Sequence, residues 1–171
     1  MNADLHHMAE TRHGAAAPGR RQVGEAAMIL GYAGLLPQIA AVAIATFDPR
    51  LGLGAMFAFG YAALILSFLG GIWWGFAMRA TADPMADRGQ GTIAGLAVVP
   101  PLIAAALILL LICRLMPMSW ALVLLGSTVL LTLLVDRRLA EERVAPAGWM
   151  AMRVPLSIGL GVLTIACGTL A

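Results

Sequence analysis

The chain has 171 residues, of which 61% are hydrophobic and only 12% are charged, and its formal net charge is +2. A soluble domain usually has about a quarter of its residues charged, so this composition excludes an ordinary soluble domain and favours a protein surrounded by lipid. The small net charge argues against a nucleic-acid partner, and two cysteines are too few for a disulfide framework.

Residues 1–25 are polar, contain glycine and proline, and show no helical periodicity of apolar residues. We expect a flexible cytoplasmic tail here. The tail contains His6, His7 and His13, the three histidines of the chain. Isolated histidines on a mobile segment lack the rigid geometry and the supporting hydrogen bonds of a metal centre, so we expect no metal site.

Five apolar runs follow the tail and form a predicted membrane domain over residues 26–171. Their bounds are about 26–46, 55–78, 92–113, 118–135 and 154–171. A helix needs about 20 residues to cross about 30 Å of hydrocarbon, so the first three runs are long enough and the last two are marginal. We predict an all-α, polytopic integral membrane protein with five transmembrane helices. A cleaved signal peptide is the alternative for the first run, but that run exceeds the usual apolar core of about 7–15 residues.

The arginines determine the predicted orientation. The tail, the second loop and the fourth loop together contain nine of them: Arg12, Arg20, Arg21, Arg79, Arg88, Arg137, Arg138, Arg143 and Arg153. The first and third loops contain only Arg50 and Arg114. Because basic residues concentrate in cytoplasmic loops, we predict a cytoplasmic N-terminus and an exterior C-terminus. The absence of lysine and the many alanines suggest a GC-rich bacterial genome, and hence the bacterial inner (plasma) membrane.

Prolines lie in three of the runs. Pro37 is in the first, Pro100 and Pro101 are in the third, and Pro155 opens the fifth. Pro155 suits the first turn of a helix, whereas the other prolines free backbone carbonyls and predict kinks. Kinks of this kind line cavities in some transporters. They are also common packing features of membrane helices, which is the simpler interpretation.

The second run contains a ridge of small residues. On a helix with about 100° per residue, Gly60, Ala63, Ser67, Gly71 and Gly75 share one half of the circumference, and bulky residues occupy the other half. Small residues at intervals of four let two helix backbones approach closely. We therefore predict that this ridge packs against neighbouring helices.

Two adjacent tryptophans accompany this ridge. Trp73 lies toward its margin, and we interpret it as an interfacial residue of the aromatic belt. Trp74 falls within the small-residue half, where it either fills the core or forms the wall of a ligand pocket. Core packing is favoured because no ionisable residue accompanies Trp74 on the helix.

Few residues could support chemistry. Gln38 is the most costly polar side chain to bury in a span and is a candidate functional residue. The fourth loop contains Asp136, Trp149 and Arg153, which an interfacial enzyme could use, although arginine and tryptophan also suit anionic headgroups. The sequence lacks the motifs of hydrolases, metalloproteases and phosphate-binding loops. We therefore expect no enzymatic activity and no cofactor.

Five segments taken in order resemble one family: LGYAGLLPQIA, YAALILSFLGGIWWGFA, VVPPLIA, DRR and AGWMAMRVPL. Over roughly residues 26–165 the chain is similar to an uncharacterised family, a domain of unknown function, that includes transmembrane protein 69. The resemblance implies a small multi-pass protein of bacterial or mitochondrial inner membranes. It implies no established activity.

The predicted function is that of a non-enzymatic integral inner-membrane protein that acts through helix packing or through contact with a partner or with lipid. The expected partners are membrane lipids and either a protein partner or further copies of the chain as a homo-oligomer, with no nucleic acid. The alternative is a small transporter or permease for a neutral or hydrophobic solute, with Gln38 and Trp74 lining its path.

Overall fold

The computed structural model describes residues 25–47, 52–78 and 84–171. These residues form six α-helices: α1 Glu25–Ala33, α2 Leu36–Phe47, α3 Leu53–Ala77, α4 Pro84–Ile112, α5 Met118–Glu141 and α6 Trp149–Leu170. Five helical segments are long and apolar enough to span a membrane, the first of them formed by α1 and α2 together. The all-helical fold with five such segments is therefore confirmed. The predicted N-terminal tail lies outside the described residues, apart from Glu25.

The first span is broken between α1 and α2, next to Pro37. Because proline has no N–H, the regular helical bond at this position cannot form. The chain instead turns at Gly34 and Leu35, and the Leu35 N–H bonds to the Tyr32 carbonyl at 3.0 Å. The Tyr61 hydroxyl of α3 donates a hydrogen bond to the Gly34 carbonyl. A polar group freed by the break is thus satisfied by a neighbouring helix, as a lipid environment requires.

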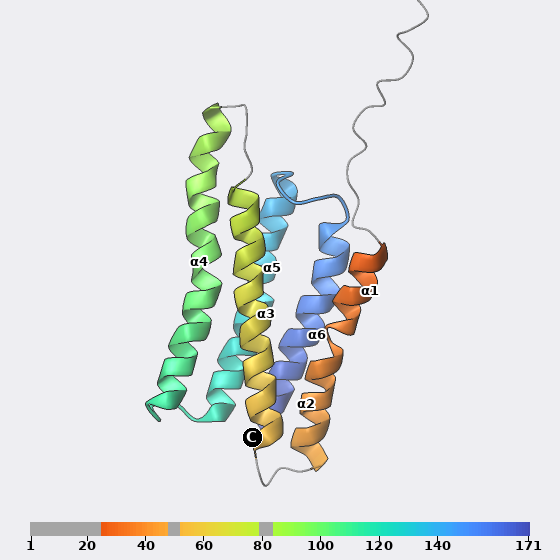
Figure 1. Cartoon of the computed structure of the whole chain (residues 1–171), viewed down its shortest axis with the longest axis vertical. Coiled ribbons are helices and arrows are strands. Elements are labelled where there is room, and N and C mark those ends of the chain that lie inside the picture. Colours follow the sequence, from red (N-terminus) through yellow and green to blue (C-terminus); the bar gives the residue numbers. More distant parts are fainter. Residues whose placement is uncertain (1–24, 48–51, 79–83) are drawn as a thin grey trace, which may run out of the picture.

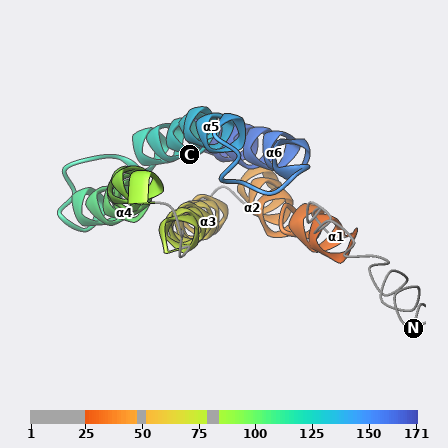
Figure 2. The ribbon, with the colours of Figure 1, turned by 90° about the horizontal axis from the view of Figure 1, so that it is seen from above.

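The helices form two layers (Figures 1 and 2). Helices α5 and α6 lie side by side on one face, and α4, α3, α2 and α1 follow one another along the other. Helix α5 packs most extensively on α6, and α3 packs most extensively on α4, whereas α1 packs on α6. The central core contains the fully buried side chains Leu66, Leu122, Leu125 and Cys167.

The closest helix contacts are made by glycines other than those of the predicted ridge. A Cβ atom added at Gly126 of α5 would lie 2.7 Å from the Gly161 carbonyl of α6, and one added at Gly161 would lie 3.0 Å from the Gly126 carbonyl. A Cβ atom at Gly70 of α3 would lie 2.4 Å from the Ala97 carbonyl of α4. Pro101 cannot donate to that carbonyl, so Gly70 lets α3 approach α4 at the proline pair.

The predicted packing ridge on α3 contacts no other described helix of the chain at three of its five positions. A Cβ atom at Gly60, Gly71 or Gly75 would meet nothing within 4 Å, and all three glycines are exposed. Ala63 is buried and Ser67 is half-buried. The helical periodicity correctly grouped the small residues on one face, but most of that face is directed away from the other helices of the chain.

The last two spans are longer than the sequence suggested. Helix α5 has 24 residues and α6 has 22, so neither is marginal. Helix α5 ends in a Schellman motif, in which the Val144 N–H bonds to the Leu139 carbonyl at 2.9 Å and Arg143 adopts a positive φ of 59°. Helix α6 then begins at Trp149, so Pro155 lies inside the helix and does not open it, contrary to the prediction.

Candidate functional site

Asp136 is a fully buried carboxylate near the end of α5. Its Oδ1 atom accepts hydrogen bonds from the indole Nε1 of Trp73 at 2.9 Å and of Trp149 at 3.2 Å. Its Oδ2 atom accepts a hydrogen bond from Nε of Arg153 at 2.9 Å. Donors from α3 and α6 thus converge on one carboxylate of α5, and we call these four residues the Asp136 cluster.

The two adjacent tryptophans have the opposite roles from those predicted. Trp73 is only 2% exposed and donates to Asp136, so it is not an interfacial belt residue. Trp74 is 47% exposed, so it neither fills the core nor lines the cavity described below. Consecutive residues of a helix point about 100° apart, and the prediction separated the two tryptophans correctly by this angle. It was wrong about which of the two directions faces the other helices.

Arg153 and Asp136 form a buried ion pair, with side chains 7% and 0% exposed. The Arg153 guanidinium also lies 5.8 Å from the centre of the Trp149 ring, within the range of a cation–π contact. Trp149 in turn packs edge-on against Phe76 of α3, with ring centres 5.5 Å apart. The charges are therefore enclosed by aromatic side chains, where a pair survives only if its hydrogen bonds are well made.

Two polar atoms beside this cluster have no hydrogen-bond partner among the described residues. They are Nη2 of Arg153 and Oγ of Ser157, and both are buried. The two residues are four positions apart and therefore lie on one face of α6. Unpaired buried donors are uncommon in proteins, and each is a point at which water or a ligand is expected.

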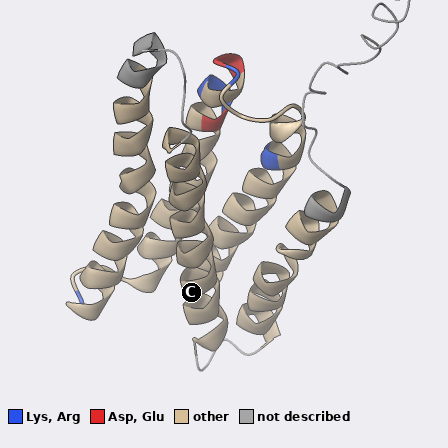
Figure 3. Ribbon diagram, turned by 45° about the horizontal axis from the view of Figure 1, so that its top comes forward, with Lys and Arg blue, Asp and Glu red and all other residues tan. Residues whose placement is uncertain are grey.

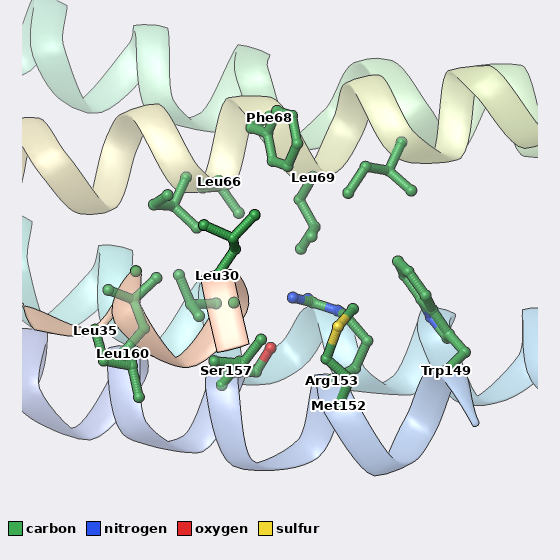
Figure 4. Close-up of a pocket in the computed structure, with 16 residues that line it drawn as sticks. Leu30, Leu35, Leu66, Phe68, Leu69, Trp149, Met152, Arg153, Ser157 and Leu160 are labelled. Atoms are coloured by element: carbon green, nitrogen blue, oxygen red, sulfur yellow. The ribbon is translucent and has the colours of Figure 1, made fainter. Parts of the chain in front are cut away.

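A cavity of about 440 Å³ is lined by residues that include Arg153 and Ser157. It is bounded by α1, α3, α5 and α6, and its lining consists of Leu30, Gly31, Gly34, Leu35, Ile65, Leu66, Phe68, Leu69, Ile72, Val129, Trp149, Met152, Arg153, Leu156, Ser157 and Leu160. Figure 4 shows the Arg153 guanidinium and the Ser157 hydroxyl directed into this space, with Leu66 and Leu69 opposite them on α3. The volume lies within the range of about 300–1,000 Å³ for small-molecule pockets.

Gln38 takes part in a separate polar contact. Its side chain is fully buried, and Nε2 donates to the Thr164 hydroxyl at 2.9 Å. Its Oε1 atom has no partner among the described residues, but Gln38 does not line the cavity. The contact joins α2 to α6, as interhelical polar pairs do in membranes.

The charged residues near the site gather at one end of the bundle. Figure 3 shows the described acidic and basic residues concentrated where α5 ends and α6 begins. Arg114 lies between α4 and α5 and therefore at the opposite end of α5. Arg137 and Glu141 form the exposed pair that their spacing predicts, at 2.8 Å. No group of three or more His, Cys, Asp or Glu among the described residues could hold a metal ion, and Cys113 and Cys167 are free.

Of the residues that the sequence singled out, the structure brings Asp136, Trp149 and Arg153 together. Trp73 and Ser157 belong beside them and were missed as site residues. Trp149, Arg153 and Ser157 recur at intervals of four, which is one face of a helix. That signal was hidden because the predicted helix began at residue 154, which left Trp149 and Arg153 in a loop.

Comparison with known proteins gives a family and no characterised relative. No curated protein and no solved structure matches the chain significantly. The family described as "Protein of unknown function (DUF3429)" matches residues 23–169. The segments that supply the Asp136 cluster all lie within the matched residues. Because the match covers most of its length, the chain belongs to this family of proteins of unknown function.

Proposed function

We propose that the chain is a multi-pass protein of a bacterial inner membrane, with its N-terminus in the cytoplasm and its C-terminus outside. The nine-to-two distribution of arginines supports this orientation. The test is a pair of fusions after residue 171. A C-terminal alkaline phosphatase should be active and a C-terminal green fluorescent protein dark, whereas an inactive phosphatase with a bright fluorescent protein would reverse the orientation.

Within that membrane, we propose that the protein binds a small apolar molecule and performs no chemistry on it. The single observation that carries this proposal is the cavity between α1, α3 and α6, whose lining includes two residues of α6 that carry unpaired polar atoms. Pockets of this kind combine a mostly apolar lining with a few polar groups that fix the orientation of the ligand.

Binding is favoured over transport by the packing beyond the cavity. Leu122 and Leu125 of α5 are fully buried, and Gly126 of α5 and Gly161 of α6 approach so closely that a Cβ atom added at either would lie within 3.0 Å of the other's carbonyl. The permease predicted as the alternative needs a path past this region. Trp74 lies on the outer surface and Gln38 is enclosed by the core, which argues against one path lined by both residues.

The experiment compares two tryptophan substitutions on α6. Leu156 lines the cavity, so Leu156→Trp should fill it, whereas Ile158 is 46% exposed on the outer surface and Ile158→Trp is the matched control. Each protein is purified in mild detergent, and co-purifying small molecules are identified by mass spectrometry. We expect a molecule retained by the native chain and by Ile158→Trp and lost from Leu156→Trp. Equal retention by all three proteins would refute the proposal.

A further inference from the structure

The chemistry of the cavity wall narrows the class of molecule that it takes. This inference rests on the proposed binding function and concerns the group that meets Arg153 and Ser157. Both residues are more than nine-tenths buried, with 6% and 1% of their surface exposed. The Arg153 guanidinium and the Ser157 hydroxyl are directed toward the cavity (Figure 4), and Nη2 and Oγ are their unpaired atoms. Both atoms carry N–H or O–H groups, so the matching ligand group is a hydrogen-bond acceptor.

The charge balance of the wall favours an uncharged acceptor. The positive charge of Arg153 is already compensated by Asp136, whose two oxygens accept three hydrogen bonds from the cluster. Of the described residues that line the cavity, Arg153 is the single ionisable one. A carboxylate or phosphate would therefore bring an uncompensated negative charge into an apolar site, at high cost. A neutral carbonyl oxygen accepts the same two hydrogen bonds without that cost.

The rest of the cavity suits an apolar body. Apart from Arg153 and Ser157 the lining is formed by aliphatic and aromatic residues, Met152, Gly31 of α1 and Gly34 of the turn that follows it. Leu30 of α1 and Phe68 of α3 line the cavity and are 72% and 66% exposed. The opening is therefore between α1 and α3, where hydrocarbon surrounds a membrane helix. A molecule dissolved in the bilayer can enter from the side.

We propose that the cavity binds a lipid-soluble molecule with a neutral carbonyl group, and that Arg153 Nη2 and Ser157 Oγ donate to the carbonyl oxygen. Two kinds of membrane molecule offer this chemistry, namely the ester carbonyl of a glycerolipid and the ring carbonyl of a quinone.

The test uses four probes that share a ten-carbon chain: methyl decanoate, decylbenzoquinone, sodium decanoate and decane. Each is titrated by calorimetry into the purified full chain in dodecyl maltoside, and the signal from Leu156→Trp is subtracted as partition into the micelle. We expect at least one carbonyl probe to bind about tenfold more tightly than decane, since hydrogen bonds to a charged group discriminate by about this factor or more. Decanoate should bind more weakly than the carbonyl probe.

Ser157→Ala is the variant that tests the contact itself. Because Oγ has no partner in the described chain, removing it should leave the unliganded fold intact while lowering carbonyl binding about threefold to tenfold. Decane binding should not change. Ser67→Ala on α3 is the control, because that hydroxyl bonds to the Ala63 carbonyl of its own helix and lies outside the cavity.

The outcomes separate this inference from the proposed function. Tight methyl decanoate binding supports an ester lipid, and tight decylbenzoquinone binding supports a quinone. If decane matches both carbonyl probes, or decanoate exceeds them, the carbonyl assignment is wrong although a binding cavity exists. If no probe binds the native chain above the Leu156→Trp reference, the proposed function fails with it.

Discussion

Replacing Asp136 by asparagine should strongly destabilise the bundle, because it exchanges one oxygen of a fully buried carboxylate for an amide nitrogen. The asparagine Oδ1 can still accept from the indoles of Trp73 and Trp149. Its amide nitrogen, however, would take the place of Oδ2 and face Nε of Arg153, 2.9 Å away in the native chain. Two donors would then oppose each other, and the guanidinium would lose its buried counterion.

The size of the effect follows from the burial of the pair. Breaking a buried ion pair by removing one partner costs about 3–5 kcal/mol, because the remaining charge has no compensation. The side chains here are 7% and 0% exposed, so the full range applies. Arg137 and Glu141 on the same helix form a pair whose side chains are 73% and 61% exposed. Glu141→Gln is therefore the matched control, with an expected loss below about 0.5 kcal/mol.

The measurement is the free energy of unfolding in mixed micelles, titrated with sodium dodecyl sulfate and followed by circular dichroism. A double variant, Asp136→Asn with Arg153→Gln, tests whether restoring a matched donor and acceptor recovers the lost stability. Glutamine places its Oε1 atom where arginine has Nε, so it can accept from the new amide. The double variant should recover all but about 1–2 kcal/mol of the loss. If Asp136→Asn costs less than about 1 kcal/mol, or the second change restores nothing, the buried charge pair does not hold these helices as described.

Three further predictions use the same unfolding assay. Gly161→Ala should lower the free energy of unfolding by about 1–3 kcal/mol, because the new Cβ would lie 2.7 Å from a side chain of α5 and 3.0 Å from its backbone. Gly71→Ala is the control, because a Cβ there meets open space, and it should be neutral or slightly stabilising. Equal losses from the two variants would contradict the described packing. Arg143→Gly should raise the free energy of unfolding by about 1 kcal/mol, because Arg143 has a φ of 59° that glycine adopts without strain; a loss of stability would show that its side chain matters more. Trp73→Phe should lower the free energy of unfolding by about 2–3 kcal/mol, since the Trp73 indole donates to a buried carboxylate. Trp74→Phe should lower it by less than about 0.5 kcal/mol, since Trp74 is exposed. The reverse order would overturn the assignment of the two rings.

The membrane segments could be predicted from the sequence because each is a long run of apolar residues, a local property. The helix ends at residues 141 and 149 could not. Charged residues after Val135 suggested that the fourth span stops there, but the helix continues to Glu141. Pro155 suggested a helix start, but α6 tolerates it in its interior. Proline inside a membrane helix is common because neighbouring groups satisfy the freed carbonyl.

The cluster was harder to predict because it depends on contacts between distant segments. Trp73 and Asp136 are 63 positions apart in the chain. A helical wheel gives the angle between two side chains of one helix, but it does not give which side the other helices occupy. On α3 the small residues were assumed to face inward, since they favour close approach. The structure instead places Trp73 and the neighbouring Leu69 inward, and the aromatic ring fills the space beside Asp136.

The distribution of contacts around the cavity makes it suited to a ligand that enters from the bilayer. The Asp136 cluster joins α3, α5 and α6 through hydrogen bonds to a single carboxylate, so this corner is held independently of any ligand. Helix α1 packs on α6 and is separated from α2 by the break at Gly34 and Leu35. The wall formed by α1 is therefore the least restrained part of the cavity. A bound molecule that contacts both α1 and α3 would supply packing that the chain lacks there, and binding energy in a membrane comes from such close contacts.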